Sequence, residues 1–347
     1  MKRLSAWLGF GIWALTALFP KDGGAQAPYY AGKTITVIEG NSPGGTADLR
    51  TKTIVSFLQK YIPGNPTIVT QYVPGAGGRQ AASQVFRAAP DGLTIGATSP
   101  GVLSSAVLGA PGADYDPFKF IYLGSPFSQN NNMFVTRKAL GLDSLEKLRA
   151  ASGLRIGAQS VGHVQYIRGR LMAWLLDLKD PRFVVGYSGT ELDVALERGE
   201  VDARAAALDA DTMSESYKNL VDFHAIIEIP KGHRPPQFAH LPEIETFVRS
   251  DIERRLMAMA RIFWGVGTLK YLPPGTPEKF AEILRQAVRE TFKDRQFHEQ
   301  YKKVLGVYPT PLMPEDQQKL VATLPRDPEV IKVFKTISGL DPLPPRR

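Results

Sequence analysis

The feature that most constrains this sequence is a change of apolar periodicity across a short loop that is rich in glycine. Residues 34–38 (Thr-Ile-Thr-Val-Ile) alternate in polarity and are β-branched, which predicts a strand. Residues 47–61 then place apolar side chains three and four residues apart, which predicts an amphipathic helix. Further strands are predicted at 67–69 and 93–95. This strand–loop–helix order is typical of a mostly parallel sheet that is covered by helices.

A second group of the same kind occupies the middle of the chain. Its predicted strands are 133–135, 154–157 and 183–185, and its predicted helices are 144–151, 165–176 and 192–198. The apolar run 261–266 predicts a strand that returns to the first group. Thr276 and Pro277 then begin a helix, because a hydroxyl cap followed by proline favours a helix start. The proline-rich end, 341–347, predicts a frayed tail.

These two groups predict an α/β fold with two lobes and a ligand cleft between them. We expect residues 28–128 plus 258–347 to form the first lobe, and residues 129–257 to form the second. In folds of this class, small ligands bind in the cleft at the carboxyl ends of the strands.

The N-terminus has the pattern of a secretory signal. Lys2 and Arg3 precede an apolar stretch over residues 6–19, and small residues follow at 23–27. We therefore expect residues 1–27 to be a signal peptide that is cleaved near Ala27, and the mature protein to be exported to the periplasm. Because an exported protein has no ready access to cytoplasmic ATP or NAD, kinase and dehydrogenase activities are disfavoured.

Composition excludes several kinds of site. The 347 residues include no cysteine, which removes disulfides, cysteine-bound zinc, iron–sulfur clusters and thiol nucleophiles. The formal net charge is +8, but the basic residues are scattered among acids, so we expect no nucleic-acid partner. Residues 75–77 begin like a dinucleotide-binding motif, yet Gln80 stands where its third glycine belongs. We expect no cofactor and no metal.

Two glycine-bearing loops carry the clearest functional signal. Residues 41–48 and 74–78 each join a predicted strand to the start of a helix. Glycine permits close approach of the backbone, and the first turn of a helix leaves N–H groups without partners inside the helix. Such an arrangement favours a carboxylate or phosphate. The charges of Arg168 and Arg170, in contrast, are expected on a solvated helix face.

A hydrolase is an alternative from a different class. Residues 158–162 (Ala-Gln-Ser-Val-Gly) differ at one position from the nucleophile elbow of serine hydrolases, and they lie between a predicted strand and helix. Ser160 would be the nucleophile. Asp209 and either His224 or His233 follow in the chain order that such enzymes require.

Several further pieces of the sequence occur together in the order of a known family. They are residues 43–48 (Pro-Gly-Gly-Thr-Ala-Asp), 74–78 (Pro-Gly-Ala-Gly-Gly), 88–95 (Ala-Ala-Pro-Asp-Gly-Leu-Thr-Ile), 115–117 (Tyr-Asp-Pro), 199–202 (Gly-Glu-Val-Asp) and 274–277 (Pro-Gly-Thr-Pro). The chain resembles the extracytoplasmic solute receptors of tripartite tricarboxylate transporters, the TctC or Bug family. The resemblance covers nearly the whole mature chain.

The resemblance implies a periplasmic binding protein of the type II, Venus-flytrap kind that closes over one small organic acid. It implies no enzymatic activity, and membrane transporter subunits or a signalling protein as partners; we expect a monomer. Carried over by position, the ligand-binding residues are Asn41, Ser42, Gly44, Gly45, Thr46, Ala76 and Gly77 from the first lobe, with Ser160, Gly162 and His163 from the second. Asp48 would orient the first loop.

This sequence also departs from the family pattern. The second-lobe loop, 159–164, carries His163 and aliphatic side chains in place of hydroxyls, and 205–207 are alanines near where the family has an acid. Residues 186–189 (Gly-Tyr-Ser-Gly) replace a common Pro-Tyr-Lys-Gly. We therefore expect a ligand that is larger, aromatic or less polar than a simple dicarboxylate. An exported interaction protein with a degenerate cleft is a further alternative.

Overall fold

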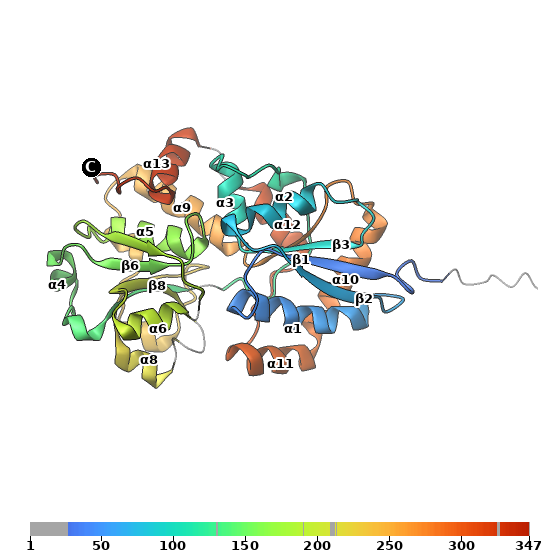
Figure 1. Cartoon of the computed structure of the whole chain (residues 1–347), viewed down its shortest axis with the longest axis horizontal. Coiled ribbons are helices and arrows are strands. Elements are labelled where there is room, and N and C mark those ends of the chain that lie inside the picture. The colour runs from blue at the N-terminus through green and yellow to red at the C-terminus, as the bar shows by residue number, and fades with distance from the viewer. Residues whose placement is uncertain are drawn as a thin grey trace, which may run out of the picture.

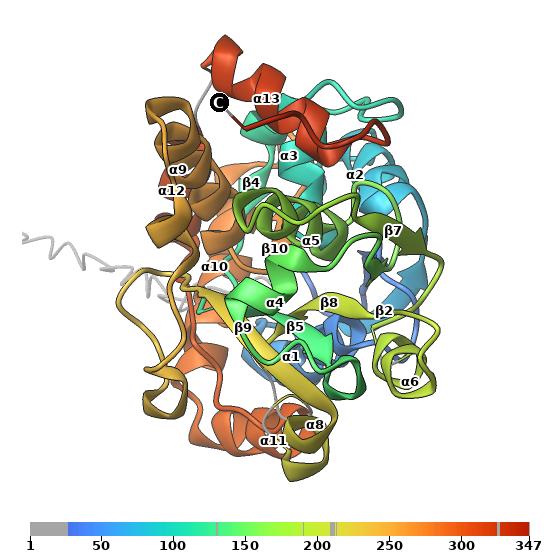
Figure 2. The same ribbon diagram turned by 90° about the vertical axis from the view of Figure 1, so that its left-hand side faces the viewer.

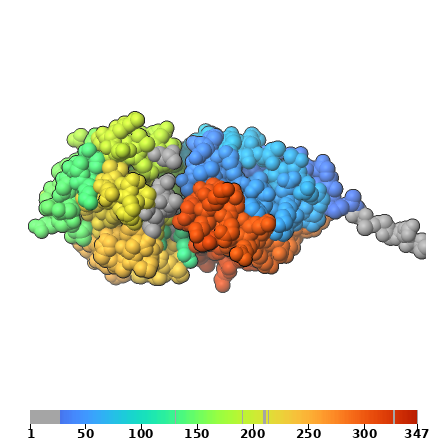
Figure 3. Space-filling model, turned by 90° about the horizontal axis from the view of Figure 1, so that it is seen from below, coloured from blue at the N-terminus to red at the C-terminus, as the bar shows by residue number. Residues whose placement is uncertain are grey.

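The computed structural model describes residues 27–129, 131–189, 191–208, 212, 214–324 and 327–346. Two lobes lie side by side along the longest axis, each built around its own sheet (Figure 1). In the view from below, the lobes are two masses that meet at the middle of the molecule (Figure 3). The predicted α/β class with two lobes is therefore confirmed. The expected signal peptide falls almost wholly on residues 1–26, which lie outside the described part of the chain.

The first sheet has the strand order β2-β1-β3-β10-β4. Its strands are β1 (Thr34–Glu39), β2 (Thr67–Tyr72), β3 (Thr94–Thr98), β4 (Ile121–Tyr122) and β10 (Leu269–Leu272). β1 pairs in parallel with β2 and β3, whereas β10 runs antiparallel between β3 and β4. Its helical elements are α1 (Thr46–Tyr61), η1 (Ala76–Gly78), α2 (Arg79–Phe86), α3 (Gly101–Val107), η2 (Pro117–Lys119), α10 (Glu278–Lys293), α11 (Arg295–Leu305) and α12 (Pro314–Ala322).

The second sheet repeats this plan in the order β7-β6-β8-β5-β9. Its strands are β5 (Asn132–Arg137), β6 (Arg155–Ala158), β7 (Arg182–Val185), β8 (Ala203–Ala207) and β9 (Val221–Ile227). β6 is parallel to β7 and β8, and β5 is antiparallel to β8 and β9. Its helical elements are η3 (Lys138–Leu140), α4 (Leu145–Ala150), α5 (Val164–Leu175), α6 (Glu191–Arg198), α8 (Glu215–Leu220), η4 (Pro236–Phe238) and η5 (Ile244–Phe247).

Alternation along the strands explains why each sheet is covered on both faces. In β1, Ile35 and Val37 belong to the apolar cluster formed with α1, α10 and α11, whereas Ile38 belongs to the cluster formed with α2 and α3. In β5, Phe134 faces the cluster that contains α5, and Met133 faces the cluster under α6 and α8. Side chains at even and odd positions of a strand point to opposite faces, so both faces are buried.

One predicted strand is wrong. Residues 261–266 overlap the last turns of helix α9 (Asp251–Gly265), and the strand that returns to the first sheet is β10 instead. Ser250 caps α9 by accepting a hydrogen bond from the Glu253 amide. Leu256, Ala260, Phe263 and Trp264 continue a helical stripe, of which the short run 261–266 shows only the end.

The C-terminal segment also differs from expectation. Helix α13 (Pro328–Ser338) packs against α5 and α9 (Figure 2). The residues after it are held by hydrogen bonds, since Tyr166 Oη donates to the Gly339 carbonyl and Trp174 Nε1 to the Pro344 carbonyl. The tail is therefore bound to helix α5 of the second lobe and is not frayed. The division of the lobes at residues 128 and 258 stays a prediction.

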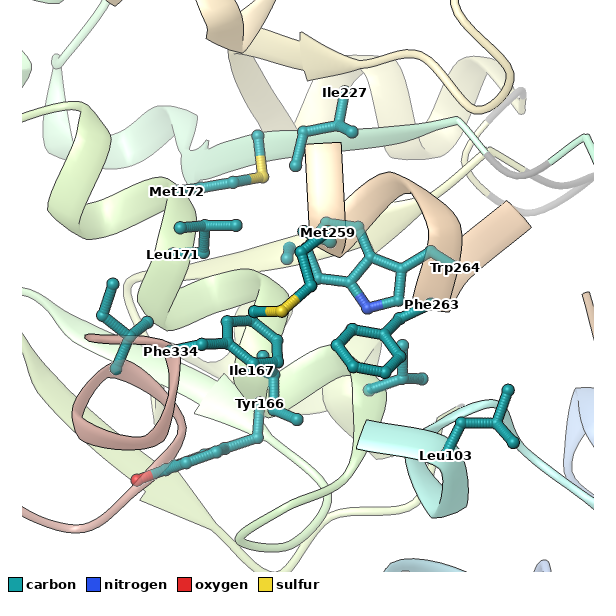
Figure 4. Packing of buried hydrophobic residues seen from close by; sticks show 14 of the residues in the cluster. Leu103, Tyr166, Ile167, Leu171, Met172, Ile227, Met259, Phe263, Trp264 and Phe334 are labelled. Atoms are coloured by element: carbon teal, nitrogen blue, oxygen red, sulfur yellow. The ribbon is translucent and has the colours of Figure 1, made fainter. Parts of the chain in front are cut away.

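One apolar cluster spans both lobes. Around Trp264 of α9 it gathers Leu171 of α5, Phe334 of α13 and Leu103 of α3, the last from the first lobe (Figure 4). Burial of this surface ties the lobes together where the chain crosses between them. In the described part of the chain, no helix is long and apolar enough to cross a membrane.

Candidate functional site

A cavity of about 620 Å³ lies between the lobes at the carboxyl ends of their parallel strands. The loops after β1, β2 and β3 line it from the first lobe, and the loops after β6 and β7 line it from the second. Ala207 at the end of β8 and Thr268 just before β10 complete the wall. Both sheets therefore present the same edge to one hollow, which is where α/β folds bind small ligands.

The loop after β1 presents backbone to the cavity. Helix α1 starts after Gly45, which has no capping side chain, and Gly45, Thr46 and Ala47 line the hollow. The N–H groups of this first turn have no partners within the helix and attract an anion. Asp48 holds the loop from behind, because its Oδ2 accepts the Gly44 amide at 2.7 Å.

The negative charge of the buried Asp48 carboxylate is stabilised by hydrogen-bond donors around it. Burial alone would raise its pKa, but hydrogen bonds from Lys52, the Gly44 amide and Tyr72 outweigh burial and lower the pKa below its ordinary value. Asp48 is therefore ionised at neutral pH and braces the loop. This confirms the expected orienting role.

The loop after β2 adopts a conformation that few sequences allow. Four consecutive residues, Gly75 to Gly78, have positive φ angles, including +48° at Ala76. Glycine takes up such angles without a steric penalty, which explains why three of the four are glycine. Helix α2 begins after Gly78 without a side-chain cap, and the whole loop lines the cavity.

The second-lobe loop reaches the cavity at the start of α5. His163 caps this helix, since its Nδ1 accepts the Gln165 amide at 3.3 Å. Burial, reinforced by the Arg168 charge, lowers the pKa of His163 to about 4. The imidazole is therefore neutral at pH 7. Because Nδ1 accepts, the ring proton lies on Nε2, which is available as a donor.

The two lobes touch beside the cavity through glycines. A Cβ on Gly77 would meet the Gly162 carbonyl at 3.4 Å, and a Cβ on Gly101 would meet the same oxygen at 3.2 Å. Any larger side chain at these positions would therefore press against the opposite lobe. The glycines permit the two loops to close on each other.

Two arginines line the cavity where the sequence analysis expected none. Arg50 of α1 lies over the Phe127 ring at 3.8 Å, and Arg168 of α5 lies over the Trp264 ring at 4.9 Å. The expectation that Arg168 faces solvent is wrong, because its side chain is buried. The expectation for Arg170 is wrong too, because its guanidinium is buried against the Ile337 and Asp341 carbonyls.

Two buried charged residues, Glu39 and Lys270, lie near the start of the first cavity loop. Glu39, at the end of β1, accepts the Asn41 amide at 3.0 Å and is fully buried. Burial raises its pKa, and the nearby Lys270 charge acts in the opposite direction. The pKa of Lys270 is lowered to about 8, because burial outweighs the opposing effect of the Glu39 charge.

The structure brings together most of the residues proposed from the sequence. Those that line the cavity are Asn41, Ser42, Gly45, Thr46, Ala76, Gly77, Ser160 and His163. Gly44 and Gly162 are not among the lining residues: the first gives its amide to Asp48, and the second contacts the Gly77 loop. Asp209, the acid of the hydrolase alternative, lies outside the described residues.

Several residues that line the cavity were not predicted from the sequence. Besides the two arginines, they include Gln165, Tyr187, Ser99 and Thr268. Tyr187 belongs to the loop 186–189 (Gly-Tyr-Ser-Gly), which departs from the family pattern but was not predicted to contact the ligand. Arg50 and Arg168 each stand four residues after the first residue of a helix that follows a cavity loop. That shared spacing is the signal that could have identified them, because residues four apart share a helix face.

The hydrolase alternative gains no support from this geometry. Neither His224 nor His233 lines the cavity: the first contacts Thr136 Oγ1 at 2.7 Å, and the second is exposed and contacts the Lys231 carbonyl. Within the described ranges, no hydrogen bond joins the Ser160 hydroxyl to a histidine. Those ranges also contain no group of three histidine, aspartate or glutamate residues placed to hold a metal ion.

Neither a protein-family profile nor a curated protein sequence matches this chain. Solved structures do. The periplasmic binding protein BugD superposes with a TM-score of 0.67 at 18% identity, covering 89% of this chain and 98% of BugD. MatC from Rhodopseudomonas palustris, solved with bound malate, gives 0.65 at 22% identity, covering 88% of this chain and 99% of MatC.

A further R. palustris structure, determined with adipate, gives a TM-score of 0.64 at 19% identity and covers 86% of this chain and 94% of that one. The coverage is nearly complete on both sides, so the likeness extends over both lobes. The expectation drawn from the sequence motifs is thereby confirmed at the level of the fold: this chain has the two-lobed fold of these periplasmic binding proteins.

Proposed function

We propose that this chain is an exported solute receptor that holds a small organic acid between its two lobes and has no catalytic activity. The observation that carries this proposal is the cavity of about 620 Å³ between the lobes, at which the uncapped starts of the first-lobe helices α1 and α2 meet the start of the second-lobe helix α5. Helix N-termini that converge on one hollow favour an anion. The malate and adipate in two structures of the same fold are consistent with this class of ligand.

The proposed contacts follow from the lining residues. Backbone amides of the two first-lobe loops would bind one side of the ligand, and Ser160 and the Nε2–H of His163 would donate from the second lobe. Gly44 and Gly162 would act on the shape of the loops rather than touch the ligand. The expected signal peptide would direct the receptor to the periplasm. There it would act as a monomer, with membrane transporter subunits as its partners.

Binding would act by a shift between open and closed forms. The ligand touches both lobes only when they are closed, so it favours closure by the difference in contact. Gly77 and Gly101 allow the loops of opposite lobes to meet in the closed form.

A thermal-shift screen of mono-, di- and tricarboxylates tests the proposal. A ligand at 100 times its Kd stabilises the fold by about 2.7 kcal/mol, which gives a clear increase in Tm. Small-angle scattering with a saturating hit should show a smaller radius of gyration. Ser42→Tyr narrows the cavity and should abolish the shift, while Ser216→Tyr on the exposed face of α8 should not.

No response to any acid in the panel would refute the proposal and favour an interaction protein with a degenerate cleft. An unchanged scattering profile with a saturating ligand would contradict closure. Labelling of Ser160 by a fluorophosphonate would instead favour the hydrolase.

A further inference from the structure

Arg50 and Arg168 occupy equivalent places in the two lobes. Each stands four residues after the first residue of its helix, α1 or α5, and each helix begins at a loop that lines the cavity. Residues with this spacing lie on one face of a helix, so each guanidinium approaches the hollow from behind the helix start. One cation therefore enters the cavity wall from each lobe.

Both side chains are buried without a neutralising acid. Arg168 is 2% exposed and Arg50 is 9% exposed. Arg168 Nη1 donates to Asn132 Oδ1 at 2.9 Å, but its Nε and Nη2, and the Nε of Arg50, are buried with no hydrogen-bond partner in the structure as described. Tyr301 faces Arg50 with a phenol that stays uncharged, because burial raises its pKa. Among the described residues, no carboxylate forms an ion pair with either arginine.

Several other arginines with little exposed surface form ion pairs with acids. Arg346 pairs with Glu253, Arg204 pairs with Asp193, and Arg261 pairs with Glu243 and Glu245. An unpaired buried cation is costly, since desolvation penalises the charged form by several kcal/mol. Arg170 is also buried without an ion pair, but its guanidinium donates to the Ile337 and Asp341 carbonyls of the tail. Arg50 and Arg168 differ from these arginines in that they line the cavity.

The side chains around Arg50 and Arg168 hold the two guanidinium groups in place without neutralising their charge. The Phe127 and Trp264 rings stack against the guanidinium groups, which orients them but adds no negative charge. Burial, together with the neighbouring Arg50 charge, lowers the pKa of Arg168 to about 9. Glu191, the acid among the described lining residues, accepts the Ser188 amide at 2.6 Å, and Glu39 accepts the amide of the lining residue Asn41.

We propose that Arg50 and Arg168 select the charge of the ligand, and that together they require a solute with two carboxylates. This inference rests on the proposed receptor function and adds its selecting residues. Each guanidinium supplies charge-assisted hydrogen bonds to one carboxylate, and arginine suits this task because its planar donors match a carboxylate in pairs. A solute with two negative charges would also bridge the lobes, so it would favour closure more than a single charge does.

Isothermal titration of the intact mature protein tests the inference with charge-matched probes. Malonate, succinate, glutarate and adipate are compared with their half-amides, which keep the size but lose one charge. The best dicarboxylate should bind about tenfold to hundredfold more tightly than its half-amide, the factor expected for losing a hydrogen bond to a charged group. Inorganic phosphate serves as the probe for a single compact dianion.

Three variants assign the effect to residues. Arg50→Gln and Arg168→Gln should each lower the affinity for the dicarboxylate about tenfold to hundredfold while affecting the half-amide less. Arg254→Gln removes the same charge from the exposed face of α9 and should change neither affinity. Neither substitution leaves a buried acid without its partner. Both cavity variants should therefore remain folded, which circular dichroism checks.

The outcomes separate this inference from the proposed function. Equal affinities for a dicarboxylate and its half-amide, or full affinity in both cavity variants, would overturn the role of the arginines and leave the receptor intact. Tight phosphate binding that depends on both arginines would replace two carboxylates by one dianionic group, and so overturn the inference. Failure of every probe to bind would refute both.

Discussion

Replacing Arg346 by methionine should destabilise the folded protein strongly, although the residue is next to the end of the chain. The Arg346 side chain is 4% exposed and its partner Glu253 is 1% exposed. Arg346 Nε and Nη2 donate to the two Glu253 carboxylate oxygens at 3.0 and 2.9 Å, and Nη1 donates to the Leu175 carbonyl. The pair thereby connects the tail to both α9 and α5.

The size of the loss in folding free energy depends on the Glu253 carboxylate, which stays buried after Arg346 is replaced. Breaking a buried ion pair by removing one partner costs about 3 to 5 kcal/mol, because the other charge stays buried. Glu253 keeps one hydrogen bond from the Arg249 amide at 2.6 Å and a favourable place in the first turn of α9. We therefore expect about 3 kcal/mol, a large share of the 5 to 15 kcal/mol typical of folded domains.

Urea unfolding followed by circular dichroism measures this loss. Arg255→Met is the matched control, because Arg255 also bridges α9 to α13, through Asp327 and Glu329, but is exposed. Exposed pairs are worth up to about 1 kcal/mol. A second variant, Glu253→Gln with Arg346→Met, should recover most of the stability. Equal losses in the two single variants would refute the argument from burial.

The effect should also depend on pH. Burial by itself raises the pKa of Glu253, but the hydrogen bond from Arg346 and the Arg249 amide outweigh it, so the net pKa is lowered. A lowered carboxyl pKa contributes stability above the ordinary pKa of glutamate, and this contribution is lost as pH falls through the lowered value. The difference between wild type and Arg346→Met should therefore shrink below about pH 4. A difference that stays constant down to pH 3 would contradict this assignment.

Three further predictions concern the cavity loops. Asp48→Asn removes the charge that braces the first loop, so it should lower stability by about 1 to 3 kcal/mol in urea unfolding and weaken ligand binding in titration; unchanged binding would contradict the bracing role. His163 stays neutral in the fold down to a pKa of about 4, whereas the unfolded chain takes up the proton near 6.5. Wild type should therefore lose about 2 kcal/mol more than His163→Asn, which keeps a capping oxygen, when urea unfolding is moved from pH 7.5 to pH 5; parallel losses would exclude His163 as the source. Gly77→Ala strains a φ of +66° and fills the contact with the Gly162 carbonyl of the opposite lobe, while Gly109→Ala carries similar strain at φ +61° with open space around it. Both should cost about 1 kcal/mol of stability, but titration should show weaker ligand binding in Gly77→Ala alone.

The sequence by itself determined the class of fold and most of the loops at the cavity. The change from a period of two to a helical period fixes a strand, a turn and a helix within one local stretch, as at 34–38 and 47–61, because each pattern matches one backbone geometry. The glycines at 75, 77 and 78 likewise report their positive φ angles locally. Such features depend on near neighbours in the chain, so they can be inferred without knowing the rest of the fold.

Local patterns failed where the answer depends on distant residues. The run 261–266 has the composition of a strand, and the helix that contains it is recognised only from the longer stripe that packs against α13 and α12. The tail 339–346 looks unstructured by composition, yet α5 supplies donors for its carbonyls from about 170 residues away. Propensity is a weak guide in such cases, because packing partners decide the outcome.

The arginines of α5 show most clearly what only the tertiary structure decided. Arg168 and Arg170 are two residues apart, and by sequence both belong on a solvated face. In the fold, α5 is covered on nearly all sides, so that one guanidinium lines the cavity and the other is held by the C-terminal tail. A charge is buried when the surrounding elements enclose it, and those elements come from both lobes and from the end of the chain. No window of sequence around Arg168 contains that information.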